Sequence, residues 1–131
     1  MNSIPPGVWN AIDYERLAVQ SMDAGRYAYV AGGCGWDRAV AANRAAFARW
    51  AVLPRLMRDM RSGHSRITLG GLDLPHPLLL APVAHQRLAH ADAEIATARA
   101  AAATGSCLVA STLSSCTLEE IAAASGPARW F

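Results

Sequence analysis

Two histidines in the middle of the chain are the first candidates for chemistry, because imidazole binds metals and transfers protons near neutral pH. His85 and His90 lie five residues apart in a predicted loop, and no third ligand follows at a spacing typical of a metal site. His90 comes just before a predicted helix, where a structural role is favoured, and His85 is a candidate for the border of a pocket. We therefore expect no metal site.

Cysteine is the next candidate, as a nucleophile or a disulfide partner. The three cysteines, Cys34, Cys107 and Cys116, form an odd and sparse set. Such a set indicates free thiols in a reducing compartment rather than a disulfide framework. Cys107 lies in an apolar run typical of a core strand, and no neighbour of any of the three indicates nucleophilic catalysis.

Arginines form the third candidate group. Five of them lie between Arg44 and Arg61, together with Phe47 and Trp50, a combination that could bind phosphates and stack on bases. The net charge is only +2, however, and no nucleic-acid-binding motif accompanies the run. A solvated helix face explains these arginines better, and we expect no nucleic-acid partner.

The composition is that of a folded domain. The chain has 131 residues, of which 53% are hydrophobic and 17% charged, so it is neither a disordered tail nor strongly basic. No apolar run approaches the ~20 residues of a membrane span. Residues Met1–Trp9 lack the basic stretch and apolar core of a secretory signal. These features predict a cytoplasmic protein.

Helical patterns dominate the first half of the chain. Residues 12–30 predict one or two short amphipathic helices, with Asp13 as a candidate cap. Residues 36–60 predict another short helix that includes Trp50 and ends or restarts at Pro54.

A small hairpin and a buried strand are predicted next. Ile67–Leu69 and Leu72–Leu74 are β-prone runs on either side of a Gly-Gly turn. The unbroken apolar run Leu78–Ala81 is typical of a strand covered on both faces.

The second half alternates between strands and helices. A helix is predicted from about Asp92, at its start, to Thr104, with Glu94 in the first turn, where negative charge is favourable, and Gly105 as its stop. A second helix follows the capping box Thr117–Glu120. The predicted elements after the first strand are a helix over 92–104, a strand over 107–111, a helix over 118–124 and a strand beginning at 128. This order predicts parallel strands with right-handed crossovers. Two βα units and a third strand are not a closed (β/α)8 barrel, which takes about 250 residues.

Short motifs in this order resemble the amino-terminal part of the FMN-dependent α-hydroxy-acid oxidase and dehydrogenase family, which includes glycolate oxidase, lactate oxidase and mandelate dehydrogenase. The resemblance covers about residues 13–131, and its order and spacing are specific. The matching stretches are Tyr27–Gly33, Asn43–Phe47, Pro54–Arg55, Ala81–Ala84, Leu88–His90, Ala96–Ala101, Ser111–Thr112, Leu118–Ala122 and Trp130–Phe131.

The resemblance implies a fold and a reaction. The fold is α/β, in which amino-terminal helices and a hairpin (residues 1–77) precede the first βα units of a TIM barrel (residues 78–131) within one FMN hydroxy acid dehydrogenase domain. The reaction oxidises a small 2-hydroxy acid to a 2-oxo acid, with FMN as cofactor. Oxygen or an electron carrier then reoxidises the flavin, and a dehydrogenase of this kind could work at the membrane periphery.

The resemblance also assigns roles to residues. Tyr29 matches a tyrosine whose hydroxyl binds the substrate carboxylate. Leu113 stands where several oxidases have tryptophan or tyrosine over the substrate, which implies a different and wider apolar pocket.

Four further residues match positions that contact the flavin. They follow the first two predicted barrel strands, at the strand ends that form active sites in this fold. Threonine is frequent in the family where this chain has valine. The four residues are Pro82, Val83, Ala84 and Ser111.

The family's catalytic residues fall beyond Phe131, so the resemblance implies that this chain carries none and is inactive alone. We expect it to be the amino-terminal portion of a flavoenzyme whose remainder completes the barrel, and which forms tetramers when complete. The alternatives are a truncated, non-catalytic product and a binding module that keeps only part of the fold.

Overall fold

The computed structural model describes residues 4–131. The first three residues of the segment Met1–Trp9, for which no secretory signal is expected, lie outside the described residues. The chain divides into two compact units, residues 1–56 and 57–131. None of the helices within residues 4–131 has the length and apolar character needed to cross a bilayer.

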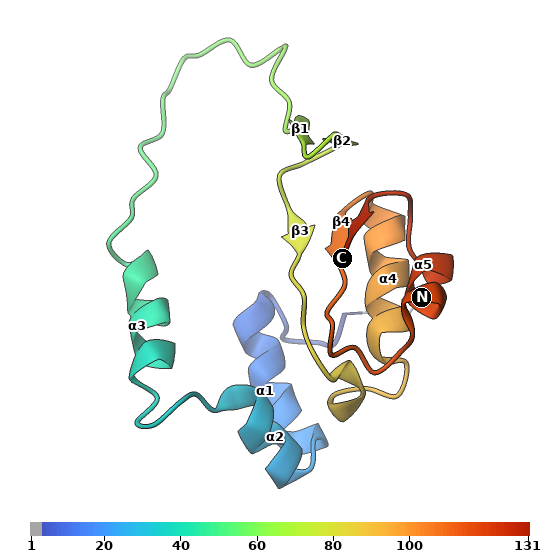
Figure 1. Ribbon diagram of the computed structural model, residues 1–131. Coiled ribbons are helices and arrows are strands. Elements are labelled where there is room, and N and C mark those ends of the chain that lie inside the picture. The colour runs from blue at the N-terminus through green and yellow to red at the C-terminus, as the bar shows by residue number, and fades with distance from the viewer. Residues whose placement is uncertain (1–3) are drawn as a thin grey trace. The chain divides into compact units, whose positions relative to one another are not determined.

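The first unit contains three helices, α1 (Ala11–Ser21), α2 (Ala24–Ala31) and α3 (Arg38–Phe47) (Figure 1). The predicted pair of short helices is confirmed. The predicted cap is wrong, because Asn10 rather than Asp13 occupies the N-cap of α1. Asn10 Oδ1 accepts from the amides of Ile12 and Asp13, while Asp13 Oδ2 accepts from the Asn10 amide at 3.2 Å. Asp13 therefore completes a capping box from the third helical position.

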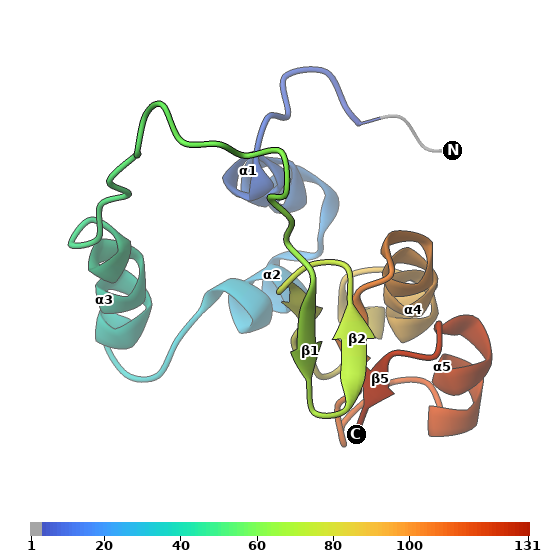
Figure 2. The ribbon, with the colours of Figure 1, turned by 90° about the horizontal axis from the view of Figure 1, so that it is seen from above.

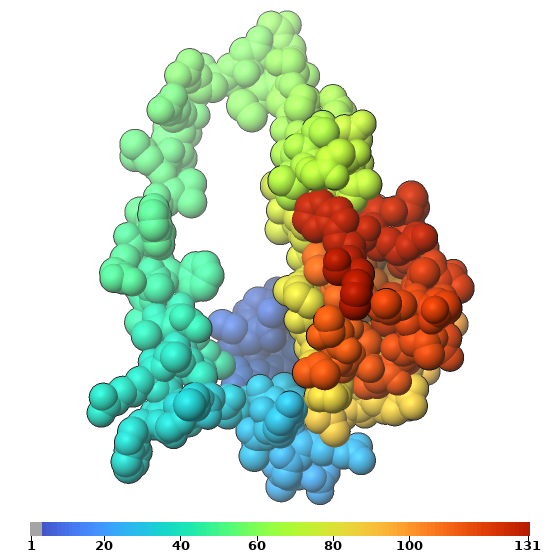
Figure 3. Space-filling model, viewed as in Figure 1, coloured from blue at the N-terminus to red at the C-terminus, as the bar shows by residue number. Residues whose placement is uncertain are grey.

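The third helix is shorter than expected. It ends at Phe47, and the Trp50 amide donates to the Phe47 carbonyl at 3.1 Å, so the chain tightens into three-residue turns and leaves the helix well before Pro54. Residues 48–66 contain no helix or strand. In the space-filling view most of this segment is a single file of green residues (Figure 3). The guanidinium of Arg44 on α3 makes an ion pair with Glu15 of α1 at 2.7 Å.

The second unit begins with the expected hairpin, in which β1 (Ile67–Leu69) pairs antiparallel with β2 (Leu72–Leu74). Gly70 and Gly71 both have positive φ, +56° and +79°, as the tight two-residue turn requires. At Gly70 a methyl group would lie 2.6 Å from Cζ2 of Trp130, so the turn also depends on close contact with an indole ring.

The parallel strands are β3 (Leu79–Leu80), β4 (Cys107–Val109) and β5 (Arg129–Trp130), in that order across the sheet. Helices α4 (Ala93–Thr104) and α5 (Leu118–Ala124) connect them and lie beside each other next to the strands (Figures 1 and 2). The predicted alternation of parallel strands and helices is confirmed. The strand Leu79–Leu80 is only half-buried. Leu80 packs against the core between α4 and α5, but the expected burial of this strand on both faces is not observed.

A small apolar core holds this unit together. Its buried members are Ala98 and Ala101 of α4, Leu108 of β4 and Ile121 of α5. Alanines on α4 allow the two helices to approach each other closely, which explains why so alanine-rich a helix can form a core. Thr117 and Glu120 form the expected capping box of α5. Asp92 occupies the N-cap of α4, as expected from its predicted place at the helix start, but its side chain makes no capping hydrogen bond.

Candidate functional site

The candidate site lies where two neighbouring parallel strands end. Leu79 pairs with Cys107 and Leu80 with Leu108, so the carboxyl ends of β3 and β4 reach the same edge of the sheet. The loop after β3 (residues 81–92, loop A) and the loop after β4 (residues 110–117, loop B) therefore begin side by side. Active sites of parallel α/β folds form at this edge.

Backbone hydrogen bonds join the two loops directly. The His85 amide of loop A donates to the Leu113 carbonyl of loop B at 3.0 Å, and the Arg87 amide donates to Ser115 Oγ at 3.2 Å. His85 adopts a left-handed conformation, with φ +52°, which is uncommon for a residue with a side chain. Strained backbone of this kind persists where surrounding contacts fix it, often at functional sites.

A buried carboxylate reinforces the junction. Glu94, at the start of α4, is 3% exposed. Its Oε1 atom accepts from the Gln86 amide of loop A at 3.1 Å and from the Ser115 amide of loop B at 2.9 Å.

The same amides determine the charge of Glu94. Burial by itself raises the pKa of this carboxyl, but hydrogen bonds from backbone amides, Ser115 first among them, outweigh burial and lower the pKa below its ordinary value. The nearby thiol of Cys116 also lowers the pKa of Glu94, as the last of these contributions. Among residues 4–131, Glu94 Oε2 is buried without a hydrogen-bond partner.

The residues expected at the flavin lie at the start of the joined loops. Val83 is 54% exposed, and within residues 4–131 no group accepts from the amides of Val83 or Ala84. Ser111 Oγ accepts from the Leu113 amide at 3.1 Å, which leaves the hydroxyl proton of Ser111 available to another acceptor. This part of the loops therefore offers two free amide donors and a hydroxyl donor beside exposed apolar side chains. Such a set fits a flat ring with carbonyl and nitrogen acceptors on its edge, such as a flavin.

The residues expected at the substrate occupy different units. Leu113 lies in loop B and is 58% exposed, so it lies beside the predicted flavin residues. Tyr29 lies on α2 of the first unit with its side chain exposed. The structure thus brings together Pro82, Val83, Ala84, Ser111 and Leu113, all within the two loops.

The histidine next to α4 has a structural contact. His90 Nδ1 accepts from the Asp92 amide at 3.1 Å and so orders the entry to α4. Within residues 4–131, no three His, Cys, Asp or Glu side chains are grouped as metal ligands. Cys107 is buried in β4, as expected of a core residue, and burial raises the pKa of its thiol.

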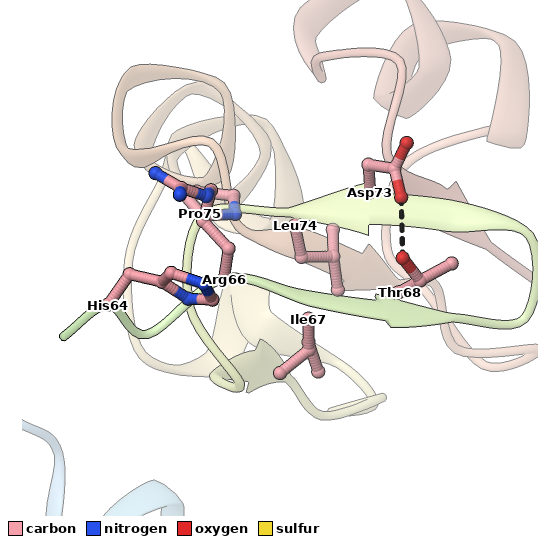
Figure 4. A pocket seen from close by; sticks show the side chains of 7 residues that line it. All are labelled: His64, Arg66, Ile67, Thr68, Asp73, Leu74 and Pro75. Carbon is pink, nitrogen blue, oxygen red and sulfur yellow. Dashed lines mark hydrogen bonds between the residues drawn. The ribbon is translucent and has the colours of Figure 1, made fainter. Parts of the chain in front are cut away.

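A cleft of about 560 Å³ opens elsewhere in the second unit, along the hairpin (Figure 4). Thr68 Oγ1 donates to Asp73 Oδ1 at 2.7 Å across its strands. None of the predicted site residues lines this cleft, so it supports no part of the site. The lining residues are His64, Arg66, Ile67, Thr68, Asp73, Leu74 and Pro75.

Sequence reasoning placed Glu94 in the first turn of a helix and missed its contacts with the loops. A signal was present in the spacing, since Glu94, Ala98 and Ala101 recur at intervals of four and three residues. That spacing places all three on one helix face, and the two alanines mark that face as buried. An acidic residue on a buried face needs hydrogen-bond donors from outside its own helix.

Comparison with known proteins extends these observations. The profile of the family described as FMN-dependent dehydrogenase matches residues 18–131. The L-lactate oxidase of Alicycliphilus denitrificans is 87% identical over 128 residues, which are 98% of this chain and 35% of that protein. The 4-hydroxymandelate oxidase of Amycolatopsis orientalis is 41% identical over 119 residues, 91% of this chain and 33% of that protein.

Solved structures show the same similarity. A mandelate oxidase variant, solved with a C4a-OH-FMN adduct, superposes with a TM-score of 0.85 at 41% identity. The match covers 91% of this chain and 36% of that one. The chain thus spans about a third of the length of the relatives it matches, and it corresponds to their amino-terminal part.

Proposed function

The chain belongs to the FMN-dependent dehydrogenase family, and from that premise we propose that it supplies the amino-terminal third of an oxidoreductase that converts a 2-hydroxy acid into a 2-oxo acid. The observation that carries the proposal is the pair of hydrogen-bonded loops at the carboxyl ends of β3 and β4. FMN, when bound to the complete protein, would supply the redox chemistry of this conversion.

The residues of the two loops would hold one edge and one face of the flavin. Pro82, Val83 and Ala84 present exposed backbone and small or apolar side chains, against which a flat ring can lie closely. The free amides of Val83 and Ala84 and the hydroxyl of Ser111 would donate hydrogen bonds to its acceptors.

Two side chains would contact the substrate. The Tyr29 hydroxyl would donate to the substrate carboxylate, and such a bond to a charged group is stronger than one between neutral groups. Leu113 would form an apolar wall and set which side chain the hydroxy acid carries. L-Lactate is the first substrate to test, because the 87% identical relative is an L-lactate oxidase.

The catalytic residues of the reaction would come from the remaining two thirds of the barrel. An apolar groove of about 240 Å³ between α5 and the parallel strands supports this proposal, because exposed apolar surface at a sheet edge calls for a covering element. The groove is lined by Leu108, Ala110, Leu118, Ile121, Ala122, Arg129, Trp130 and Phe131. From the family resemblance we also propose a cytoplasmic tetramer, with oxygen or an electron carrier as acceptor.

A fusion tests the proposal directly. This chain is joined to the part of the Alicycliphilus denitrificans L-lactate oxidase that lies beyond the matched segment, giving a protein we term the completed barrel. We expect the completed barrel to purify with visible flavin absorbance, and we expect that absorbance to bleach when L-lactate, glycolate or mandelate is added without oxygen. The intact relative serves as the control for the remainder of the barrel.

Two further samples separate the alternatives. The chain alone should carry no flavin absorbance, and the chain mixed with the separately produced remainder should recover it if the two parts assemble. Retention of FMN by the isolated chain would contradict the division of roles proposed here. A completed barrel without flavin would support a truncated, non-catalytic product instead.

A further inference from the structure

Glu94 is a charged side chain in a buried position, where such groups are rare unless other groups of the protein pair with them. The side chain is 3% exposed, and its pKa is lowered, so the carboxylate is buried in ionised form. Burying a charge is costly unless hydrogen bonds satisfy both oxygens, and Oε2 has no partner within residues 4–131. The position at the beginning of α4 offsets part of this cost, since negative charge is favoured there.

The contacts of Glu94 show what the charge achieves. Oε1 accepts one amide from each loop, Gln86 at 3.1 Å and Ser115 at 2.9 Å. Gln86 lies two residues after Ala84, and Ser115 lies two residues after Leu113. A single oxygen atom thus fixes both loops just beyond the residues proposed to contact flavin and substrate.

Neighbouring side chains extend the same network. Thr97 Oγ1, one turn further along α4, donates to Gln86 Oε1 at 2.6 Å, and Arg87 Nη2 approaches Cys116 Sγ at 3.7 Å. The backbone is strained immediately before Glu94, where Ala93 has φ +43°. The strained residue, the buried charge beside it and the two loops that this charge joins indicate that the start of α4 fixes the placement of the loops.

We propose that Glu94 is a positioning residue, which holds loops A and B at the spacing that the flavin ring and the substrate require. This inference rests on the proposed function, because the loops matter only if they carry those contacts. Glu94 itself touches neither flavin nor substrate. It acts through the Gln86 and Ser115 amides, which place Val83–Ala84 on one side and Ser111–Leu113 on the other.

Three variants of the completed barrel test the role. Glu94→Ala removes the acceptor and the charge, whereas Glu94→Gln keeps one acceptor oxygen, removes the charge and replaces the other oxygen by an NH2 donor. Ile121→Val is the matched control, because it trims a buried core side chain of α5 and removes no hydrogen bond from the Gln86 or Ser115 amide. Measurements are amide hydrogen exchange of the apoprotein, the Kd of FMN, and kcat and KM at saturating FMN.

The apoprotein measurement needs no flavin and therefore separates this inference from the proposed function. We expect Glu94→Ala to speed amide exchange at residues 84–87 and 113–116 by tenfold or more relative to exchange in β4. Ile121→Val should leave that ratio within about twofold of the unsubstituted protein. Equal acceleration in the two variants would mean that Glu94 only stabilises the unit, and would overturn the inference even if the completed barrel binds FMN.

The flavin measurements then connect loop spacing with function. We expect Glu94→Ala to raise the Kd of FMN and lower kcat at saturating FMN, each by about tenfold or more, since small misplacements near reacting groups have large effects. Glu94→Gln, which keeps one acceptor oxygen, should recover most of the loss, with a Kd raised only about three- to fivefold over the unsubstituted value. If Glu94→Ala fails to fold, a Glu94→Gln protein with exchange and FMN affinity both changed less than twofold overturns the inference.

Discussion

Ala93→Gly and Ala98→Gly remove the same methyl group from two buried positions of one helix, yet we expect their effects on stability to differ clearly. Both alanines are buried, at 3% and 0% exposed respectively. Ala93 has a left-handed backbone, with φ +43°, whereas Ala98 lies in the regular interior of α4. The comparison therefore isolates the backbone strain that precedes Glu94.

The expected magnitudes follow from three contributions. Losing a buried methyl group costs about 0.8 kcal/mol at either position. Glycine in a helix interior costs a further ~1 kcal/mol, so Ala98→Gly should lower the free energy of unfolding by about 2 kcal/mol. At Ala93 the glycine instead relieves roughly 1–2 kcal/mol of left-handed strain, which offsets the methyl loss and the added entropy of the unfolded chain. Ala93→Gly should therefore change stability by less than about 0.5 kcal/mol.

Urea unfolding of the completed barrel, followed by circular dichroism, measures the difference. The free energy change is taken from the shift of the midpoint at an unchanged slope. Flavin absorbance of the folded variants provides a second measurement, and Ala93→Gly should keep its FMN. If Ala93→Gly destabilises the protein as much as Ala98→Gly, the backbone at residue 93 is not strained, and the account of this helix start is wrong.

Further predictions concern the hairpin, the buried carboxylate and the substrate. Gly70→Ala should lower the free energy of unfolding, measured with urea, by at least ~2 kcal/mol more than Gly71→Ala. Both substitutions strain the turn, but only the first places a methyl group 2.6 Å from an indole ring. The lowered pKa of Glu94 means that its contribution to stability is complete above the ordinary value of 4.5 and is lost as pH falls through the folded value. A Glu94→Gln protein should lose less stability than the unsubstituted protein between pH 5 and pH 3, and parallel curves would contradict this. Tyr29→Phe in the completed barrel should raise KM for L-lactate by about tenfold or more, because a hydrogen bond to a charged group is lost. As the control, Tyr27→Phe on the same helix should change KM by less than about twofold.

Local rules in the sequence were sufficient for most elements of the second unit. The Gly-Gly turn between two β-prone runs specified the hairpin, and Thr117 with Glu120 specified where α5 begins. Gly105 adopts the left-handed conformation expected of a helix stop. These features depend on residues within a few positions of one another, so their outcome is set before the chain folds.

Caps were predicted less well, because several polar residues compete for one helix end. Asn10 and Asp13 can both accept amide hydrogens near the start of α1, and the structure uses both in a reciprocal box. Asp92 occupies the N-cap of α4, but its side chain makes no capping bond, and Ala93, the first residue of the helix, has a positive φ. Backbone geometry at such a point depends on the loops packed beside it, which the local sequence does not reveal.

The sequence by itself determined the family, the order of strands and helices, and the residues expected at the flavin and the substrate. It did so because strand and helix periodicity, turns and short motifs are all properties of neighbouring residues. Only the tertiary structure showed that loops A and B are joined, and that a buried, ionised Glu94 joins them. The contacts span 8 residues to Gln86 and 21 residues to Ser115, and parallel strand pairing alone brings those amides to one oxygen atom.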